Sequence, residues 1–370
     1  MSTPEPTSSA SAPAPDSTPA MSNGDANPTS TSDAPVEPLN PPPFQHLPYK
    51  LDPNWKPAPG HLGNLTPEQQ KALEVLKEEV RKEFAKPENQ TGLGEDKSKG
   101  LVWDEKRMDD TMFLRFLRAR KWDVAKAKEM LMDNERWRVD FGVDEIMRTF
   151  NFPEKEEVDK YYPQFYHKTD KEGRPIYIER LGFLDIKALY ACTTQTRQLQ
   201  RLVYEYEIFL TNRLPLSSAH PSVRHPITTS CTILDLHNVS LSLFTLNAKI
   251  REYVQQATKI GQDRYPECMG KFYIVNAPWV FSTVWSVIKK WLDPVTLEKI
   301  EILGSGEGEW KKLREEVGED ALPELLKLGG KCRCEEYREV LGGGGAEERK
   351  DGYCLDSDAG PWNPPSSKEA

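Results

Sequence analysis

The alternation of apolar and polar positions is most informative between residues 264 and 304. Residues 271–276 form a β-branched and aromatic run between a glycine and an Ala-Pro pair, which predicts a buried strand. The spacing then becomes helical, and one wide apolar stripe is formed by Phe281, Val284, Trp285, Ile288, Trp291 and Leu292. Asp293-Pro294 ends this helix, and residues 299–303 predict a second strand. The segment therefore predicts one helix between two core strands.

Helices are predicted upstream of this segment. Thr66, Pro67 and Gln69 have the arrangement of a capping box with proline in the first turn. The apolar face of the helix that follows consists of Leu73, Leu76, Val80 and Phe84. Asp110 and Asp123 begin two further helices. We therefore expect a small helical domain at residues 61–150.

The middle of the chain alternates strands and helices. Residues 166–177 predict a β-hairpin with its turn at 170–173, and 227–236 predict a strand that carries hydroxyls on one face. Helices are expected at 193–214 and 244–260. This order predicts an α/β fold with a largely parallel sheet and right-handed crossovers.

Composition narrows the function. The chain has 370 residues, 29% of them charged, and a net charge of −9. This charge argues against a nucleic-acid binder and against steady electrostatic attachment to anionic membranes. No apolar run approaches the roughly 18 residues of a membrane-spanning helix, and the N-terminus lacks the pattern of a secretory signal. The six scattered cysteines fit free thiols in a reducing cytosol.

Both ends of the chain are expected to be tails. Residues 1–43 are almost all Ser, Thr, Pro, Ala, Asn and acid, and cannot bury enough apolar surface to offset their ordering entropy. We expect a disordered Ser/Thr/Pro-rich tail at 1–60 and a second tail at 336–370.

The sequence contains no catalytic motif that we recognise. There is no GxSxG elbow, no GxxxxGK[ST] loop and no HExxH, and the six histidines lack metal-ligand spacing. We therefore expect neither an enzyme nor a metal site, and no cofactor other than a bound ligand.

Three motifs closely resemble one family. RYPE at 264–267, MGKFYIVNAP at 269–278 and LDPVTLEKI at 292–300 are similar in order and spacing to the CRAL-TRIO lipid-binding family. The nearest likeness is to its fungal phosphatidylinositol/phosphatidylcholine transfer proteins, over about 59–331 and again at 360–362. The resemblance implies a CRAL-TRIO domain at 151–335, with an apolar pocket and a gating helix, after the helical domain.

The resemblance implies a site for the phosphatidylinositol headgroup. Its residues would be Arg120, Lys121, Glu267, Thr296 and Lys299. Guanidinium and ammonium groups suit the phosphate, and the other two suit inositol hydroxyls. The alternative for Glu267 and Lys299 is an ordinary ion pair at the strand ends. We expect the neighbouring Arg115 and Arg118 to lie on a solvated helix face.

A second implied set would hold phosphatidylcholine deeper in the pocket. It comprises Tyr166, Tyr177, Tyr206, Ser230 and Thr232. Tyrosine faces hold quaternary ammonium groups, and hydroxyls donate to phosphate. The alternative is that these are core residues of ordinary kind. Gly261 stands where close relatives carry serine, and Cys268 where they carry arginine, so the sequence departs from the family pattern at these two positions.

The two-tryptophan helix has two interpretations. It is either a fixed crossover helix with tryptophans in the core, or a mobile gate that covers a cavity and contacts the membrane. The gate residues would be Phe281, Val284, Trp285, Ile288 and Trp291.

The resemblance implies a carrier of phosphatidylinositol and phosphatidylcholine that supports phosphoinositide synthesis and secretory traffic, and the absence of catalytic motifs predicts that it is not an enzyme. The expected partners are phospholipids, transiently contacted membranes and a phosphatidylinositol kinase, with no nucleic acid. We expect a cytoplasmic monomer that associates peripherally with Golgi or endosomal membranes. The alternatives are a carrier of a sterol or squalene-like lipid, and a regulator of small GTPases.

Overall fold

The computed structural model describes residue 44, residues 47–95, 97–239, 248–292 and 294–332, and residue 361. The expected C-terminal tail, apart from Pro361, and residues 1–43 lie outside these ranges, as does the start of the helix expected at 244–260. Within the ranges, none of the helices has both the length and the apolar character needed to cross a bilayer.

Part of the expected N-terminal tail is ordered. Leu51 is buried, and the Asp52 amide donates to the Arg224 carbonyl at 2.9 Å. The Trp55 ring stacks on His225 with ring centroids 5.4 Å apart. The prediction of a disordered tail up to residue 60 is therefore wrong for this part, because apolar and aromatic residues from here on find partners in the fold.

Four helices form the N-terminal part of the fold: α1 (Pro67–Phe84), α2 (Asp110–Ala119), α3 (Val124–Phe141) and α4 (Val143–Thr149). The predicted capping box of α1 is present, since Thr66 and Gln69 each accept a hydrogen bond from the other's amide. Asp123 caps α3 as predicted. The cap of α2 is Asp109, one residue before the predicted Asp110. The apolar faces of α1, α2 and α3 meet in one buried cluster.

The sheet has five strands in the order β1-β2-β3-β4-β5. These are β1 (Gln164–Thr169), β2 (Pro175–Arg180), β3 (Ser230–Asp235), β4 (Met269–Val275) and β5 (Ile300–Ile302). β1 and β2 form the predicted antiparallel hairpin, and the other three pairs are parallel. The predicted largely parallel sheet is confirmed.

The two faces of the sheet differ. One face carries Ile176, Ile178 and Ile233, which pack with Leu313 and Val317 of α12 (Glu307–Val317). The alternate residues of the same strands point to the opposite face, because side chains along a strand have a period of two. That opposite face forms a wall of the cavity described below.

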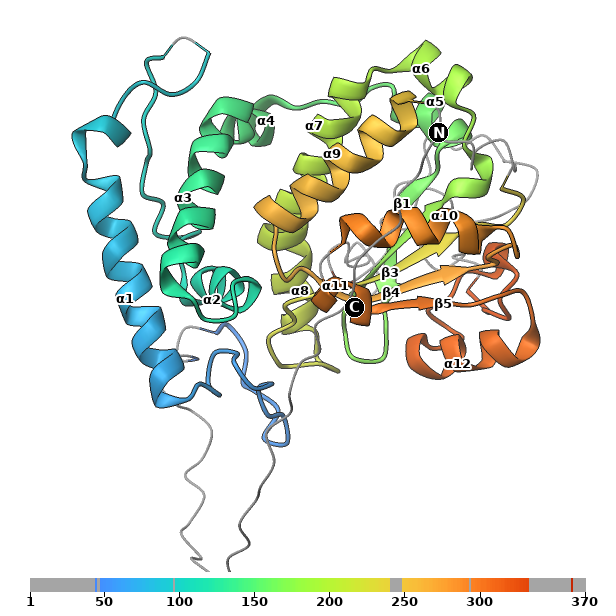
Figure 1. The fold of residues 1–370 in the computed structure, drawn as a ribbon. Helices are drawn as coiled ribbons and strands as arrows, with labels where there is room; N and C mark the ends of the chain where they lie inside the picture. Colours follow the sequence, from blue (N-terminus) through green and yellow to red (C-terminus); the bar gives the residue numbers. More distant parts are fainter. Residues whose placement is uncertain are drawn as a thin grey trace, which may run out of the picture. The chain divides into compact units, whose positions relative to one another are not determined.

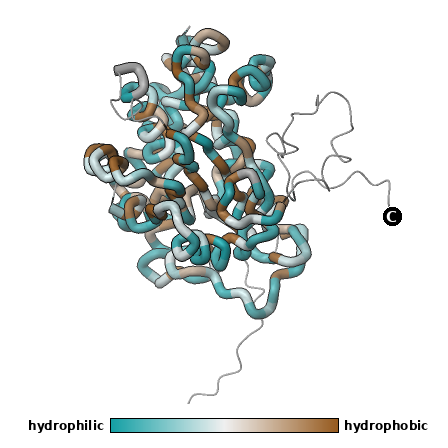
Figure 2. The backbone as a smooth tube through the Cα atoms, turned by 90° about the vertical axis from the view of Figure 1, so that its right-hand side faces the viewer, coloured by the Kyte–Doolittle hydropathy of each residue, from teal (hydrophilic) through white to brown (hydrophobic). Residues whose placement is uncertain are grey.

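Most of the remaining helices cover the second face of the sheet. α5 (Lys155–Tyr161) and α6 (Ile186–Cys192) precede α7 (Gln195–Ile208), which continues through a π-helical turn (Phe209–Arg213) into α8 (Leu214–Ala219). α7 lies beside α9 (Ala248–Arg264), and α10 (Phe281–Ile288) lies over the strands (Figure 1). α11 (Pro294–Glu298) leads into β5. Hydrophobic and hydrophilic stretches alternate along the helices, as expected for elements buried on one face (Figure 2).

The two-tryptophan helix is shorter than predicted. Its α-helical part ends at Ile288, and one 3₁₀ turn (Lys289–Trp291) follows. The apolar stripe therefore continues beyond the α-helix, because a tighter turn still presents Trp291 to the same side.

Arg115 joins the helical part to the sheet. The side chain is 6% exposed, and its two terminal nitrogens donate to the carbonyls of Glu267 and Thr228, both at 2.6 Å. The expectation that Arg115 lies on a solvated face is wrong, because this face of α2 packs against the ends of β3 and β4. The guanidinium supplies donors for two carbonyls that precede those strands.

We predict that Arg115→Met lowers the free energy of unfolding by about 2–4 kcal/mol, because it removes two hydrogen bonds from a charged donor. Chemical denaturation of the purified protein measures this. Lys82→Met, which changes an exposed cation of α1, is the matched control and should leave stability nearly unchanged. An equal effect of both variants would contradict a structural role of Arg115.

Candidate functional site

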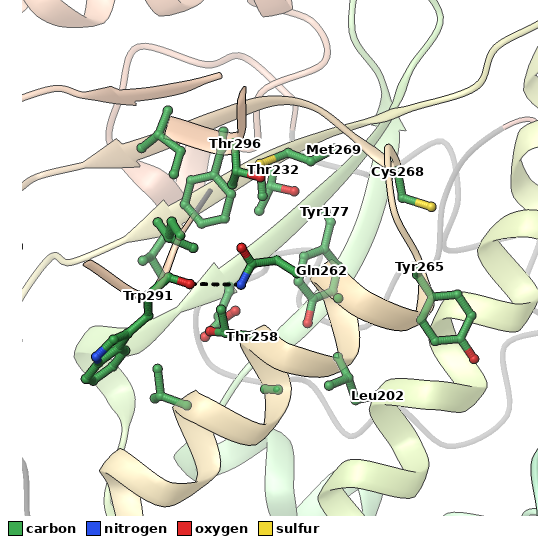
Figure 3. A pocket seen from close by; sticks show the side chains of 18 of the residues that line it. Tyr177, Leu202, Thr232, Thr258, Gln262, Tyr265, Cys268, Met269, Trp291 and Thr296 are labelled. Carbon is green, nitrogen blue, oxygen red and sulfur yellow. Dashed lines mark hydrogen bonds between the residues drawn. The ribbon is translucent and has the colours of Figure 1, made fainter. Parts of the chain in front are cut away.

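A cavity of about 810 Å³ lies between the sheet and the helices that cover its second face. Its walls include Tyr177 and Thr232 of the sheet, Leu202 of α7, and Thr258 and Gln262 of α9 (Figure 3). α10 and the junction between α2 and α3 complete it. The volume is in the upper part of the usual range for small-molecule sites.

Every site residue proposed from the sequence lines this one cavity. The set implied for the inositol headgroup is Arg120, Lys121, Glu267, Thr296 and Lys299. The set implied for phosphatidylcholine is Tyr166, Tyr177, Tyr206, Ser230 and Thr232. The set implied for the gate is Phe281, Val284, Trp285, Ile288 and Trp291. The structure thus brings together segments far apart in the chain, while the role of each residue stays a prediction.

One end of the cavity holds an ion pair. Lys299 Nζ lies 3.1 Å from Glu267 Oε2, and the two side chains are only 23% and 19% exposed. Thr296 belongs to α11 and Lys299 directly precedes β5, whereas Glu267 precedes β4. The ion pair weighed as an alternative therefore exists, and it faces the cavity, where a ligand can reach both partners.

The junction of α2 and α3 brings more positive charge to this end. Lys121 and Trp122 have left-handed backbone angles, with φ of 51° and 67°, which end α2 without a glycine. Arg120 donates to the Ala119 carbonyl at 3.2 Å. Neither Arg120 nor Lys121 forms an ion pair within the part of the chain that the structure describes. Left-handed angles in non-glycine residues occur preferentially at functional sites.

Arg118 belongs to the same end of the cavity, which the sequence did not predict. Its side chain is half-buried and donates to the Gly60 carbonyl at 3.1 Å, so the expected solvated position is wrong. Burial, together with the charge of Arg115, lowers the pKa of Arg118 to about 10. A cation held in this way favours an anionic group nearby. This end of the cavity therefore suits a phosphate.

Aromatic rings and hydroxyls form another part of the wall. Tyr166 and Tyr177 are directly paired across β1 and β2, with ring centroids 5.1 Å apart. The Arg213 guanidinium lies over the Tyr166 ring at 4.0 Å. Thr232 is paired with Tyr177 in the neighbouring strand, and Ser230 precedes it on the same face. Ring faces and hydroxyls thus meet on adjacent strands.

Gly261 leaves room for the Tyr206 hydroxyl. The Tyr206 ring stacks on Tyr265 at 4.4 Å, and its hydroxyl would lie 2.8 Å from a Cβ atom at position 261. A serine there would require Tyr206 to move. Glycine in place of serine therefore changes the part of the cavity wall that contains Tyr206, a member of the proposed phosphatidylcholine set.

Cys268, the second departure, is buried between this wall and α2. Its Sγ lies 3.4 Å from Arg115 Nη1, and burial raises the pKa of the thiol. Cys192, Cys231, Cys268 and Cys332 are free thiols. Among the described residues, no group of His, Cys, Asp and Glu side chains could hold a metal ion.

α10 and its 3₁₀ turn cover the cavity. Phe281 and Val284 are buried, and Trp285, Ile288 and Trp291 are half-buried. Gln262 Nε2 of α9 donates to the Trp291 carbonyl at 3.0 Å (Figure 3). This hydrogen bond links the end of the cover to the helix that faces it.

The sequence did not single out several residues that line the cavity. These are Arg118, Tyr162, Glu179, Tyr253 and Gln262. Periodicity could have found Glu179, which follows Tyr177 by two positions in β2 and shares its face. Gln262 and Tyr253 gave no signal, because a polar or aromatic residue on a helix is common.

Comparisons with known proteins agree with this architecture. The profile described as CRAL/TRIO domain matches residues 159–330, and that described as CRAL/TRIO, N-terminal domain matches residues 73–133. The Sec14 cytosolic factor of Schizosaccharomyces pombe is 44% identical, over 85% of this chain and 95% of its own length. The SEC14 cytosolic factor of Eremothecium gossypii is 43% identical, over 83% and 86%.

A plant relative has a more explicit name. The phosphatidylinositol/phosphatidylcholine transfer protein SFH7 of Arabidopsis thaliana is 43% identical, over 72% of this chain and 45% of its own length. The resemblance found in the three sequence motifs is confirmed. Because the matching regions follow the order of the fold and the fungal relatives are similar over most of their length, this chain belongs to the CRAL/TRIO family.

Proposed function

We propose that this protein carries phosphatidylinositol and phosphatidylcholine between membranes and is not an enzyme. The observation that carries the proposal is the combination, in one cavity, of a cationic end, a wall of tyrosines and hydroxyls, and apolar surface under a covering helix. The names of the relatives, which describe cytosolic factors and phosphatidylinositol/phosphatidylcholine transfer proteins, support the same activity.

Energetics explain why a carrier needs such a cavity. Each CH₂ group exposed to water costs roughly 0.8 kcal/mol, so two chains of about sixteen carbons cost on the order of 25 kcal/mol. A protein can carry the lipid through water only if it replaces the bilayer around those chains. The apolar residues of α6, α7 and α9 that line the cavity suit this requirement.

The cationic end would hold the phosphate of phosphatidylinositol. Lys299 and Arg120 would meet the phosphate, with Lys121 adding charge. Glu267 and Thr296 would bind inositol hydroxyls. The ion pair between Glu267 and Lys299 supports this assignment, because it holds an acceptor and a donor side by side toward the cavity.

Phosphatidylcholine would be held by the other wall. Ser230 and Thr232 would donate to its phosphate, and the rings of Tyr166, Tyr177 and Tyr206 would face the ammonium. Two walls for two headgroups, with shared apolar surface, fit exchange of one lipid for the other.

Two other functions would use the same fold. A sterol or squalene-like cargo would leave the cationic end without a partner, and a regulator of small GTPases would not need the cavity. Mass spectrometry of lipids extracted from the purified protein separates the three, since only the proposed function requires both phospholipids.

The cellular setting is also part of the proposal. We propose a cytoplasmic monomer that touches Golgi or endosomal membranes transiently, supplies a phosphatidylinositol kinase with its substrate and thereby supports secretory traffic. The bound phospholipid would be its only ligand, without a further cofactor.

The proposed gate and membrane contact is the segment around α10. Trp279, just before the helix, is 89% exposed, and Val287 is exposed on its outer side. Lys289 and Lys290 are exposed in the turn that follows. Aromatic and apolar side chains beside lysines suit the surface of an anionic bilayer.

The two headgroup sites should separate by mutation. Lys299→Ala with Arg120→Ala should reduce phosphatidylinositol transfer at least tenfold and largely spare phosphatidylcholine transfer, because only the cationic end is changed. Ser230→Ala with Thr232→Val, or the bulkier pair of isoleucines, should do the reverse. Transfer of each labelled lipid between vesicles measures both.

Lys82→Ala with Arg148→Ala is the control for the loss of two cations, since both are ion-paired on the surface away from the cavity. It should leave both transfer activities unchanged. Equal loss of both lipids in each site variant would mean that the two sets do not act separately.

The hydrogen bond between Gln262 and Trp291 should slow opening of the gate. Gln262→Leu removes a bond worth about 1 kcal/mol, so lipid exchange should become roughly fivefold faster where opening limits the rate. Stopped-flow measurement of lipid release to vesicles tests this. Gln256→Leu, on the exposed side of the same helix, is the control and should have no effect.

A chemical tether between α10 and α9 gives the opposite test. It should trap the bound lipid and stop exchange while thermal stability is kept or raised. Exchange at the rate of the untethered protein would identify α10 as a fixed crossover helix.

A further inference from the structure

Glu179 is a carboxyl group on the cavity wall without a cationic partner. It lies in β2, two residues after Tyr177 and on the same face of the strand. The Tyr162 hydroxyl donates a hydrogen bond to Glu179 Oε1. Glu179 forms no ion pair with any described residue. A carboxylate away from water and without a counter-charge is costly, which makes its position informative.

Two arginines close to Glu179, one adjacent in the chain and one sharing its tyrosine neighbours, pair with other acids. Arg180, the next residue, pairs with Asp235 at 3.4 Å. Arg201 of α7 directs one nitrogen to Asp159 and to the Gln164 carbonyl, at 3.3 and 3.2 Å. The described part of the fold therefore pairs these neighbouring charges and leaves Glu179 facing the cavity.

Tyrosines from three elements surround this carboxyl. Burial first, and then the charge of Glu179, raises the pKa of Tyr162, Tyr177 and Tyr253. These rings come from the end of α5, from β2 and from α9, and all three line the cavity. Burial also raises the pKa of Glu179 itself, against the hydrogen bond from Tyr162. An acid within a group of aromatic rings is the arrangement that binds an organic cation.

We propose that Glu179 is the anionic partner of the quaternary ammonium of a phosphocholine headgroup, and that Tyr162 and Tyr253 complete the aromatic wall around it. This inference rests on the proposed function and adds the residue that distinguishes the two lipids. A quaternary ammonium offers no hydrogen-bond donor, so it requires ring faces and a negative charge. Inositol is neutral and gains nothing from that charge.

The strand register supports this placement. Thr232, which would contact the lipid phosphate, is paired with Tyr177 across β2 and β3. Two residues along a strand correspond to about 6.6 Å, so Glu179 lies one step beyond the phosphate position. A phosphocholine group whose phosphate meets Thr232 can therefore reach Glu179 with its ammonium.

The competing explanation is purely structural, with Glu179 only fixing the Tyr162 hydroxyl. A comparable pair exists outside the cavity, where the Tyr161 hydroxyl donates to Glu157 Oε1 at 3.1 Å. Glu157 also pairs with Lys160. The pair of Tyr162 and Glu179 lines the cavity, whereas the pair of Tyr161 and Glu157 does not. Glu157→Gln is therefore the matched control for Glu179→Gln.

The test is competitive loading. Each protein is incubated with vesicles containing equal amounts of phosphatidylcholine and phosphatidylinositol, and the lipids bound to the folded, reisolated protein are measured by mass spectrometry. Glu179→Gln keeps the size and a hydrogen-bonding group but removes the charge. Its ratio of phosphatidylcholine to phosphatidylinositol should fall about tenfold relative to the wild type, because a charge–charge attraction inside a protein is strong. Glu157→Gln should keep the wild-type ratio.

A second pair of variants tests the aromatic wall. Tyr253→Phe keeps the ring face and should keep the ratio, whereas Tyr253→Leu removes the face and should lower it. This contrast does not depend on the charge of Glu179. Equal ratios in all four variants and the wild type would overturn the inference.

The outcomes separate this inference from the proposed function. A wild-type protein that takes up neither lipid would refute the proposed function itself. Uptake of both lipids by the wild type, with an unchanged ratio in Glu179→Gln, would refute only the role of Glu179. A parallel loss of both lipids in Glu179→Gln at a constant ratio would assign it the structural role instead.

Discussion

The cavity is the constraint on which the rest of the structure depends. If a dry void costs about 24 cal/mol per Å³, as measured for cavities in a small protein, 810 Å³ would cost roughly 20 kcal/mol. That exceeds the 5–15 kcal/mol by which a typical domain is stable. The apolar part of these walls is therefore more stable in contact with an apolar occupant than left dry or exposed to water. The apolar chains of a lipid provide that contact, whereas a small polar substrate would leave most of the apolar wall without contacts.

The cationic side chains that line the cavity are concentrated at one end of it. Arg118, Arg120, Lys121 and Lys299 gather at one end, although the whole chain has a net charge of −9. Glu267 pairs with Lys299, and a further anionic group would offset the repulsion among the remaining cations. Arg115 fixes the backbone of this end through the carbonyls of Thr228 and Glu267. Stability and ligand binding therefore depend on the same junction between α2 and the sheet.

The fold was predictable from the sequence because its signals are local. The capping box at Thr66, the hairpin turn at 170–173 and the alternation of strands and helices each depend on neighbouring residues. The burial of Arg115 was not predictable, because it depends on contacts with Thr228 and Glu267, more than one hundred residues away. The position of Arg118 depends likewise on the distant segment around Gly60. Strand alternation could have placed Glu179 on the face of Tyr177, but not the other tyrosines around it. Its neighbours Tyr162 and Tyr253 come from other elements, and no spacing in the chain brings them together.

The order of elements connects the cationic end of the cavity to the covering helix. The segment from β4 to β5 begins after Glu267 and ends at Lys299, and α10 lies between them. The ion pair of these two residues therefore joins both ends of the segment that carries the cover, and Gln262, five residues before Glu267, holds its far end through Trp291. A headgroup that contacted Lys299 or Glu267 would alter their ion pair, which joins the two ends of the segment that carries α10. A ligand shifts an equilibrium only by its different affinity for the two states, so a lipid that binds the closed arrangement more tightly must also favour closure. If Lys299 and Glu267 bind the headgroup and α10 is the gate, as proposed above, headgroup recognition and acyl-chain retention are one equilibrium, because they share one length of backbone.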